Sequence, residues 1–426
     1  MNREINIRNT FNGKDKIIKH KSGCTICLYP MPEFSTTYAI FGTKYGSVDT
    51  TFKTKADNDY ITVPEGIAHY LEHKLFESEE CDTFELFAKT GASANAFTSF
   101  DCTAYLFSCT QAFPENLKIL LNFVQQPYFT DENVEKEREI ITQEIKMYLD
   151  NPGTRAFYNC LEAVYYNNPV RIDIAGTVDS IQKIDKDLLY RCYNTFYNLN
   201  NMVLSIAGNF DVEETLAICD ELLKPSEDYK LDVLVPDEPY EVREKKVITK
   251  MSCAMPIFEL GFKIPLPKEQ NKEYLIFNVL LETAFGRTSD FYNRLYDSGV
   301  INDSFGVDVF KGRGFFLPLI SGICREPEKV TNEILNEFRR LKNEGLPKED
   351  VDIIIKMAYG QLFSIYSNVE SVAKIAMREA FYNNDIFTNI ELASKITYDD
   401  VKNALDKLDV DNYSLSIVEP NQDMEG

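Results

Sequence analysis

The sequence predicts an α+β fold of two homologous halves, each a mainly antiparallel sheet with helices packed on one face and joined by a linker. The first observation is a repeated order of elements. An amphipathic helix leading into an apolar strand that contains "LSI" occurs at 183–211 and again at 395–423. The second observation is that a strand, a polar turn and two helices precede each copy. Such a recurrence indicates a duplicated unit.

The chain length and one segment of biased composition set the domain boundaries. The 426 residues exceed what one ordinary hydrophobic core holds, so more than one domain is expected. The segment 224–246 is rich in proline and charge, which is typical of a linker. We therefore expect a first half at 1–223 and a second half at 247–426.

Three elements of the first half follow from local patterns. "CTICLYPM" (24–31) alternates as a strand does, which favours strand cysteines over a redox or zinc half-site. "VPEGIAHYLEHKLFES" (63–78) has an apolar stripe at helical spacing and an early proline, which predicts an amphipathic helix. "SANAFTSF" (93–100), after the turn at Gly91, predicts a half-buried strand.

Two long helices are predicted at corresponding places of the halves. The stretch 130–149 opens with Thr-Asp, and 347–366 opens with a proline followed by acidic residues. Both openings are typical of helix starts. The second stretch is therefore expected to be the copy of the first.

Composition limits the classes of partner and location. The net charge of −22 argues against nucleic acid or an anionic membrane as partner, because both bind basic surfaces. No run of 18 apolar residues and no signal-peptide pattern is present, so no membrane-spanning helix is expected. The ten scattered cysteines are expected to be reduced thiols. These features predict a cytoplasmic protein.

Two of the three histidines, His69 and His73, lie four residues apart with Glu72 between them. On the predicted helix, residues i and i+4 project from one face, so both imidazoles can bind one Zn²⁺ ion. Glu72 would then lie beside the metal, where a carboxylate acts as general base toward a metal-activated water. His-x-x-Glu-His is the inverzincin pattern.

A catalytic zinc needs a third protein ligand. His20, the remaining histidine, lies in a polar segment that we expect to be exposed. A cysteine is possible, but a carboxylate is the other common choice. The helix at 130–149 offers Glu137 and Glu144, two turns apart along one face.

With "HYLEH", "GASANAFTSFDCTAY" and "EKEREIITQEI" in place, the chain resembles the family of pitrilysin, insulin-degrading enzyme and mitochondrial processing peptidase. Through "GIAHYLEHKLFE" and "GASANAFTSF" it is similar to a bacterial branch associated with 5-aminopentanol modification of elongation factor P. The resemblance spans nearly the whole chain. It implies that His69, His73 and Glu144 bind zinc. It also implies that Glu72 is the catalytic base and that Glu137 is a supporting catalytic-site carboxylate.

The resemblance further implies a substrate-binding edge strand beside the metal, made of Asn95, Ala96, Phe97 and Thr98. An exposed edge binds the backbone of an extended peptide with little regard for its sequence. The amide of Asn95 could also stabilise the developing charge on the scissile carbonyl. From the residues alone, an ordinary half-buried strand is an equal interpretation.

The second half does not repeat the chemistry. Matching the long helices without gaps sets Gln361 opposite Glu144 and Ile354 opposite Glu137. The stretch 276–286, "IFNVLLETAFG", has no histidine where the histidine helix should recur. We therefore expect the first half to bear the zinc and the second to be metal-less.

The family also implies an arginine and a tyrosine from the second half. This chain has Tyr296 and Phe305 near those places, and Arg294 could substitute only if the register slips. Because losing one such donor typically costs about 100- to 1000-fold in rate, the chain alone is expected to be a weak protease unless a partner supplies the groups.

The sequence thus predicts a zinc metalloendopeptidase that hydrolyses peptides or unfolded segments, working as a heterodimer with a metal-less relative or as a homodimer. The alternative is a weakly or non-proteolytic zinc-bearing partner subunit in the modification pathway of elongation factor P. A third interpretation is a two-domain binding protein in which the histidine pair is coincidental.

Overall fold

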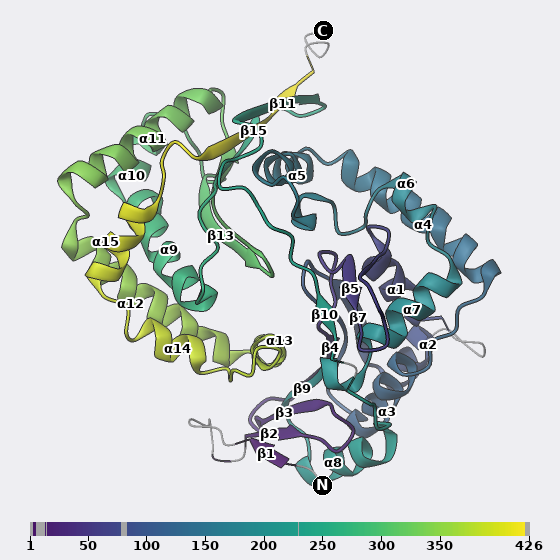
Figure 1. The fold of residues 1–426 in the computed structure, drawn as a ribbon. Helices are drawn as coiled ribbons and strands as arrows, with labels where there is room; N and C mark the ends of the chain where they lie inside the picture. The colour runs from purple at the N-terminus through teal and green to yellow at the C-terminus, as the bar shows by residue number, and fades with distance from the viewer. Residues whose placement is uncertain (1–2, 6–12, 14, 78–82, 229, 422–426) are drawn as a thin grey trace. The chain divides into compact units, whose positions relative to one another are not determined.

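The computed structural model describes the chain except residues 1–2, 6–12, 14, 78–82, 229 and 422–426. The chain divides into two compact units that alternate along the sequence (Figure 1). The first unit comprises Met1–Gln143, Ile174–Leu234 and Phe363–Thr388, and the second comprises Glu144–Asp173, Val235–Leu362 and Asn389–Gly426.

The first unit is built on a seven-stranded sheet in the order β1-β2-β3-β9-β4-β8-β7. Its neighbouring strands are antiparallel except β3 and β9, which are parallel. A small three-stranded sheet with the order β10-β5-β6 belongs to the same unit. The strands are β1 (Arg3–Ile5), β2 (Lys16–Lys19), β3 (Thr25–Pro30), β4 (Thr37–Thr43), β5 (Thr51–Lys53), β6 (Ile61–Thr62), β7 (Ser93–Thr98), β8 (Thr103–Cys109), β9 (Met202–Gly208) and β10 (Asp232–Val233).

Helices cover both faces of this sheet. Helix α3 contacts β8 and β4, whereas α13 contacts β9, β4 and β3. On α3, Leu117, Leu120, Leu121 and Val124 are buried at the i, i+3, i+4, i+7 spacing of one helix face. Each such side chain contributes about 1.5–3 kcal/mol through burial. The helices are α1 (Ile67–Leu75), α2 (Thr83–Thr90), α3 (Phe113–Val124), the start of α4 (Asp131–Leu149), α6 (Val178–Ile181), α7 (Lys186–Phe196), η2 (Leu199–Asn201), α8 (Val212–Leu222), η3 (Ile365–Ser367) and α13 (Val369–Ala380).

The contact of α13 with the sheet depends on small residues. Ala373 and Ala376 of α13 pack in one core with Ile40 of β4. A side chain at Gly42 of the same strand would overlap the sulfur of Met377. The α13 helix, although late in the chain, is therefore an integral part of the first unit.

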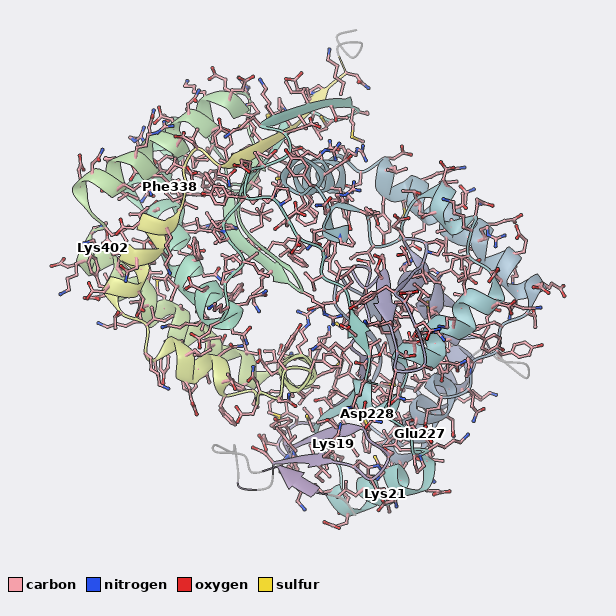
Figure 2. All side chains as sticks on the ribbon, viewed as in Figure 1. Lys19, Lys21, Glu227, Asp228, Phe338 and Lys402 are labelled. Carbon is pink, nitrogen blue, oxygen red and sulfur yellow. The ribbon has the colours of Figure 1, made fainter. Side chains whose placement is uncertain are left out.

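The second unit is built on a five-stranded sheet in the order β11-β15-β12-β14-β13. Phe338 of α11 lies in the core beneath the helices on one face, whereas Lys402 of α15 is exposed (Figure 2). Helix α5 packs on the other face against β15 and β12. The elements are α5 (Pro152–Val164), η1 (Pro169–Arg171), β11 (Lys246–Met251), β12 (Ile257–Phe262), α9 (Gln270–Phe285), α10 (Asp290–Asp297), β13 (Gly306–Gly312), β14 (Phe315–Ile323), α11 (Pro327–Glu344), most of α12 (Lys348–Ser364), α14 (Thr388–Ala393), α15 (Tyr398–Lys407) and β15 (Tyr413–Pro420).

The two sheets share one topology. The order β3-β9-β4-β8-β7 recurs as β11-β15-β12-β14-β13, with one parallel pair followed by antiparallel pairs. The predicted α+β class with two homologous sheet-and-helix halves is confirmed. Each sheet carries in addition one helix on its second face, α13 or α5.

The compact units and the predicted halves differ in two segments. Glu144–Asp173, which includes α5, belongs to the second unit, and Phe363–Thr388, which includes α13, belongs to the first. These segments begin within the corresponding long helices, α4 and α12. The duplicated units have therefore exchanged equivalent helices.

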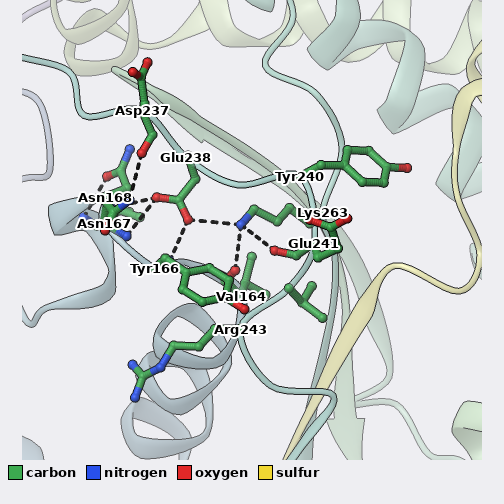
Figure 3. Close-up of polar contacts among 12 residues, drawn as sticks. Val164, Tyr166, Asn167, Asn168, Asp237, Glu238, Tyr240, Glu241, Arg243 and Lys263 are labelled. Carbon is green, nitrogen blue, oxygen red and sulfur yellow. Dashed lines mark hydrogen bonds and ion pairs between the residues drawn. The ribbon is translucent and has the colours of Figure 1, made fainter.

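The segment predicted as a linker has fixed contacts (Figure 3). The Glu238 carboxylate accepts hydrogen bonds from the backbone N–H groups of Tyr166, Asn167 and Asn168, and forms an ion pair with Lys263 at 3.0 Å. The part of the linker from residue 235 onward is thus anchored within the second unit.

None of the described helices is both long and apolar enough to span a membrane.

Candidate metal centre

The histidine pair lies on α1, which begins at Ile67, four residues after the start of the helix predicted at 63–78. Gly66 precedes the helix with φ of 86°, a conformation that favours glycine. A side chain at Gly66 would also overlap the carbonyl of Ala175. The tight entry into α1 therefore depends on this glycine.

Along α1, the rings of His69 and His73 meet edge to face one turn apart, with their centroids separated by 4.5 Å. His69, Glu72 and His73 each offer a ligand atom, and these atoms lie within 4.8 Å of one another. His69 is buried, while Glu72 and His73 are partly exposed. Imidazole nitrogens with a nearby carboxylate oxygen are a donor set that suits zinc. The three residues therefore fit a divalent metal ion.

Helix α4 supplies the partner of one histidine. The Nδ1 atom of His73 lies 2.9 Å from Oε1 of Glu137. A carboxylate at Nδ1 fixes the ring orientation and the tautomer of a histidine whose Nε2 binds metal. Burial alone would raise the pKa of Glu137, but the hydrogen bond with His73 and the charges of His73, Lys74 and Lys136 bring that pKa below its ordinary value.

A buried lysine, which was not predicted, joins the same group. Lys74 is fully buried, and its Nζ lies 2.5 Å from Oε2 of Glu77 and 3.9 Å from Oε2 of Glu137. The sequence contained a signal for it, because Lys74 occupies the i+7 position of the apolar stripe that begins at Ile67. A lysine inside such a stripe indicates a buried ammonium group with partners.

Strand β7 reaches the expected base through Thr98. The Oγ1 atom of Thr98 donates to Oε2 of Glu72 at 3.2 Å. β7 is the terminal strand of the seven-stranded sheet, so none of the other described strands pairs with its outer edge. Asn95 is exposed, whereas Phe97 is partly buried and packs against the core beneath α13. Ala96 is also partly buried. The edge character of this stretch is confirmed, and its role in substrate binding stays a prediction.

Glu144 lies seven residues after Glu137 on α4, two helical turns further along the same face. It is the first residue of the segment assigned to the second unit. Its role as third zinc ligand stays a prediction.

His20 is buried, not exposed as expected, and its ring is hydrogen bonded to Ser22 and Asp220. It is therefore engaged in the packing of β2 and β3 against α8.

The divergent residues of the second unit lie in two environments. Tyr296 is about half exposed on α10, while Phe305 is 4% exposed in the core. Arg294 forms an exposed ion pair with Glu333. Phe305 therefore cannot offer a hydrogen bond in the manner of a tyrosine.

Two family models match the middle of the chain, and solved structures resemble nearly all of it. The model described as insulinase (peptidase family M16) matches residues 56–178, and that described as peptidase M16 inactive domain matches residues 183–358. The uncharacterized zinc protease YmfH of Bacillus subtilis (strain 168) is 41% identical over 396 residues, which cover 91% of this chain and 92% of that protein.

The crystal structure of a putative M16-like peptidase from Alicyclobacillus acidocaldarius is similar with a TM-score of 0.91 and 33% identity, covering 96% of this chain and 98% of that one. Pitrilysin is similar with a TM-score of 0.77 and 16% identity, covering 99% of this chain and 46% of pitrilysin. At that identity, the likeness to pitrilysin concerns the fold alone.

Proposed function

Because the chain belongs to the M16 (insulinase) family of peptidases, we propose that it is a zinc metalloendopeptidase that hydrolyses peptides or unfolded segments. The observation that carries the proposal is the convergence of His69, Glu72 and His73 on one helix, with Glu137 at Nδ1 of His73. The relatives named zinc proteases support the choice of metal. The proposal includes a cytoplasmic location and a partner subunit, either a metal-less relative or a second copy.

The metal would be held by His69, His73 and Glu144. When bound, zinc supplies a Lewis acid that lowers the pKa of a water molecule to about 7 and polarises the scissile carbonyl. Because Glu137 engages Nδ1 of His73, the Nε2 atom of that ring is the one that would bind the metal.

Glu72 is the general base of the proposed reaction. Its carboxylate takes a proton from the attacking water and passes it to the leaving amine as the peptide C–N bond breaks, leaving a carboxylate and an amine as products. The Thr98 hydroxyl holds Oε2 of Glu72 and so fixes the orientation of this base. The unpaired edge of β7 would align the substrate backbone, with the exposed amide of Asn95 near the reacting carbonyl.

The test separates base from ligand. Replacing Glu72 with Gln is expected to abolish cleavage of an unstructured peptide while zinc content stays at the wild-type level. Replacing Glu144 with Gln is expected to lower zinc content. Cleavage retained by E72Q would refute the base assignment, and an unchanged zinc stoichiometry in E144Q would refute the third ligand.

A second candidate function is a weakly or non-proteolytic zinc-bearing partner subunit in the modification pathway of elongation factor P. Phe305 favours it, because this ring packs against Phe258 and Phe291 and has no hydroxyl to offer a substrate. Efficient chelator-sensitive cleavage by the purified chain alone would exclude this candidate. Zinc binding without cleavage would favour it over the first.

A further inference from the structure

Two lysines are buried among the described residues, Lys74 in the first unit and Lys263 in the second. A buried ammonium group persists only where carboxylates and hydrogen-bond acceptors compensate for its lost hydration. Lys74 directly follows His73, so its partners are also the surroundings of the candidate metal centre. The chemistry assigned to the site so far does not use this charge.

The partners of Lys74 tie α1 to α4. Its Nζ lies 2.5 Å from Oε2 of Glu77, 3.1 Å from the backbone oxygen of Asn133 and 3.9 Å from Oε2 of Glu137. The other oxygen of Glu137 is the partner of His73. One carboxylate thus faces the ammonium group with one oxygen and a metal-site histidine with the other.

We propose that Lys74 is the internal counter-ion of the metal-free centre, balancing Glu137 and Glu77 so that α1 docks on α4 before a metal ion binds. This inference rests on the proposed function, because it takes His73 as a metal ligand. A dication at His73 adds positive charge beside the same carboxylates, and bound cations dominate the local electrostatics of such sites. Lys74 therefore stabilises the metal-free protein and lowers its affinity for the metal.

Lys263 provides a matched control. Its Nζ donates to Oε1 of Glu238 at 3.0 Å and to the backbone oxygens of Val164 at 2.9 Å and Glu241 at 3.0 Å (Figure 3). It is thus a buried lysine paired with one carboxylate and two carbonyls, far along the sequence from the candidate ligands. Its loss removes the same kind of interaction without touching the metal centre.

The experiment measures Tm of the full chain in chelator and in excess zinc, together with the zinc dissociation constant. Lys74→Met is expected to lower Tm of the metal-free protein by roughly 5–10 °C, because it leaves the buried Glu137 and the partly exposed Glu77 without their cation. Zinc is expected to raise Tm of this variant by more than it raises that of the wild type, with zinc affinity about tenfold higher. Lys263→Met is expected to lower Tm equally with and without zinc.

Two further variants separate charge from folding. Lys74→Gln keeps donors toward Glu77 and Asn133 but removes the charge, so it is expected to repeat the larger zinc effect. Adding Glu77→Gln to Lys74→Met removes one charge of each sign and is expected to restore much of the metal-free Tm.

The proposal is overturned if zinc raises Tm of Lys74→Met and Lys74→Gln by no more than it raises the wild-type value. Failure of both variants to fold even in zinc would overturn it equally, since the metal charge then does not replace the ammonium. A wild-type chain that shows no zinc-dependent Tm shift would instead refute the proposed function.

Discussion

The two units repeat one sheet and differ in the helices that pack on it. The strand order β3-β9-β4-β8-β7 of the first unit recurs in the second. Helix α1 of the first unit carries two histidines, a glutamate and a lysine, whereas its counterpart α9 buries an aliphatic and aromatic surface. The buried residues of α9 include Leu275, Ile276, Phe277, Val279, Leu280 and Leu281.

Helices α4 and α12 differ in the same way at one position. Glu137 is 6% exposed and binds His73, while Ile354, its counterpart in the gap-free match, is 4% exposed in the core of the second unit. Both positions are equally deep, but one holds a paired carboxylate and the other an aliphatic side chain. The sheet therefore provides a scaffold, and a few side chains decide which copy carries a site.

The largest expected difference is in metal binding. His73→Ala should remove stoichiometric zinc and lower peptide cleavage at least 1000-fold. His73 is a proposed zinc ligand, and without zinc the protein can neither activate the water molecule nor polarise the scissile carbonyl. Gln361→Ala, at the position that matches Glu144, should leave both quantities unchanged. Metal analysis and a peptide-cleavage assay on the two variants check this. Zinc retained by His73→Ala would contradict the assignment of the first unit as the metal-bearing one.

A second difference concerns the pH dependence of stability. Burial, with the charge of Asp308 adding to it, raises the pKa of Glu259 on β12 to about 8, whereas the pKa of Glu137 lies below its ordinary value. When the folded state raises the pKa of a carboxyl, the contribution of that carboxyl to the free energy of unfolding is complete below its unfolded pKa of about 4.5. The contribution is lost as pH rises to 8. Glu259 should therefore remove roughly 2–4 kcal/mol of stability between pH 5 and 8.5.

Glu259→Gln should flatten this dependence and raise Tm at pH 8.5 relative to the wild type. Thermal unfolding in chelator at both pH values measures it. Glu137→Gln is the contrasting variant. Since the pKa of Glu137 is lowered, its contribution is complete above about pH 4.5 and declines only below that value. If Glu259→Gln keeps the wild-type slope between pH 5 and 8.5, the burial of this carboxyl is not what sets it.

The third prediction compares the equivalent positions of α4 and α12. Glu137→Gln should weaken zinc binding by about 10- to 100-fold, as the loss of a charged partner of a ligating histidine typically does. Ile354→Val should cost about 0.5–1.5 kcal/mol of stability and leave zinc affinity unchanged. Zinc titration and chemical unfolding of both variants give the two quantities. Equal zinc affinity in Glu137→Gln and the wild type would mean that the contact with His73 is structural only.

Much of this comparison could be predicted from the sequence, because it depends on local periodicity. The four-residue spacing of His69 and His73 gives one helix face, and the seven-residue spacing of Glu137 and Glu144 gives another. The repeated "LSI" strands indicated the duplication, which the matching strand order confirms.

The rest depends on tertiary contacts that periodicity does not encode. The exchange of α5 and α13 could not be predicted, since a helix pattern specifies an apolar face but not the sheet that covers it. The burial of His20 depends on Asp220, 200 residues away. Lys74 disrupts an otherwise apolar stripe, and its partners on α4 lie about 60 residues further along the chain.

The smallest expected effect lies in the shared sheet itself. Ser205 of β9 and Ser416 of β15 occupy the same place in the repeated "LSI" and are fully buried. The Oγ atoms of both serines have no hydrogen-bond partner among the described residues. Replacing each with Ala removes a buried polar atom without breaking a protein hydrogen bond, so stability should stay within about 0.5 kcal/mol of the wild type or rise.

Thr43→Val is the control for these two variants, because the Thr43 hydroxyl is equally buried but donates to the backbone oxygen of Phe196 at 2.6 Å. Its loss should cost about 1 kcal/mol. Urea unfolding of the three variants measures the differences. Since the two serines face α13 and α5, the exchanged helices, equal effects of their replacement would mean that these helices cover the repeated sheets in equivalent ways. A loss above 1 kcal/mol at only one serine would show that the duplicated cores have diverged there.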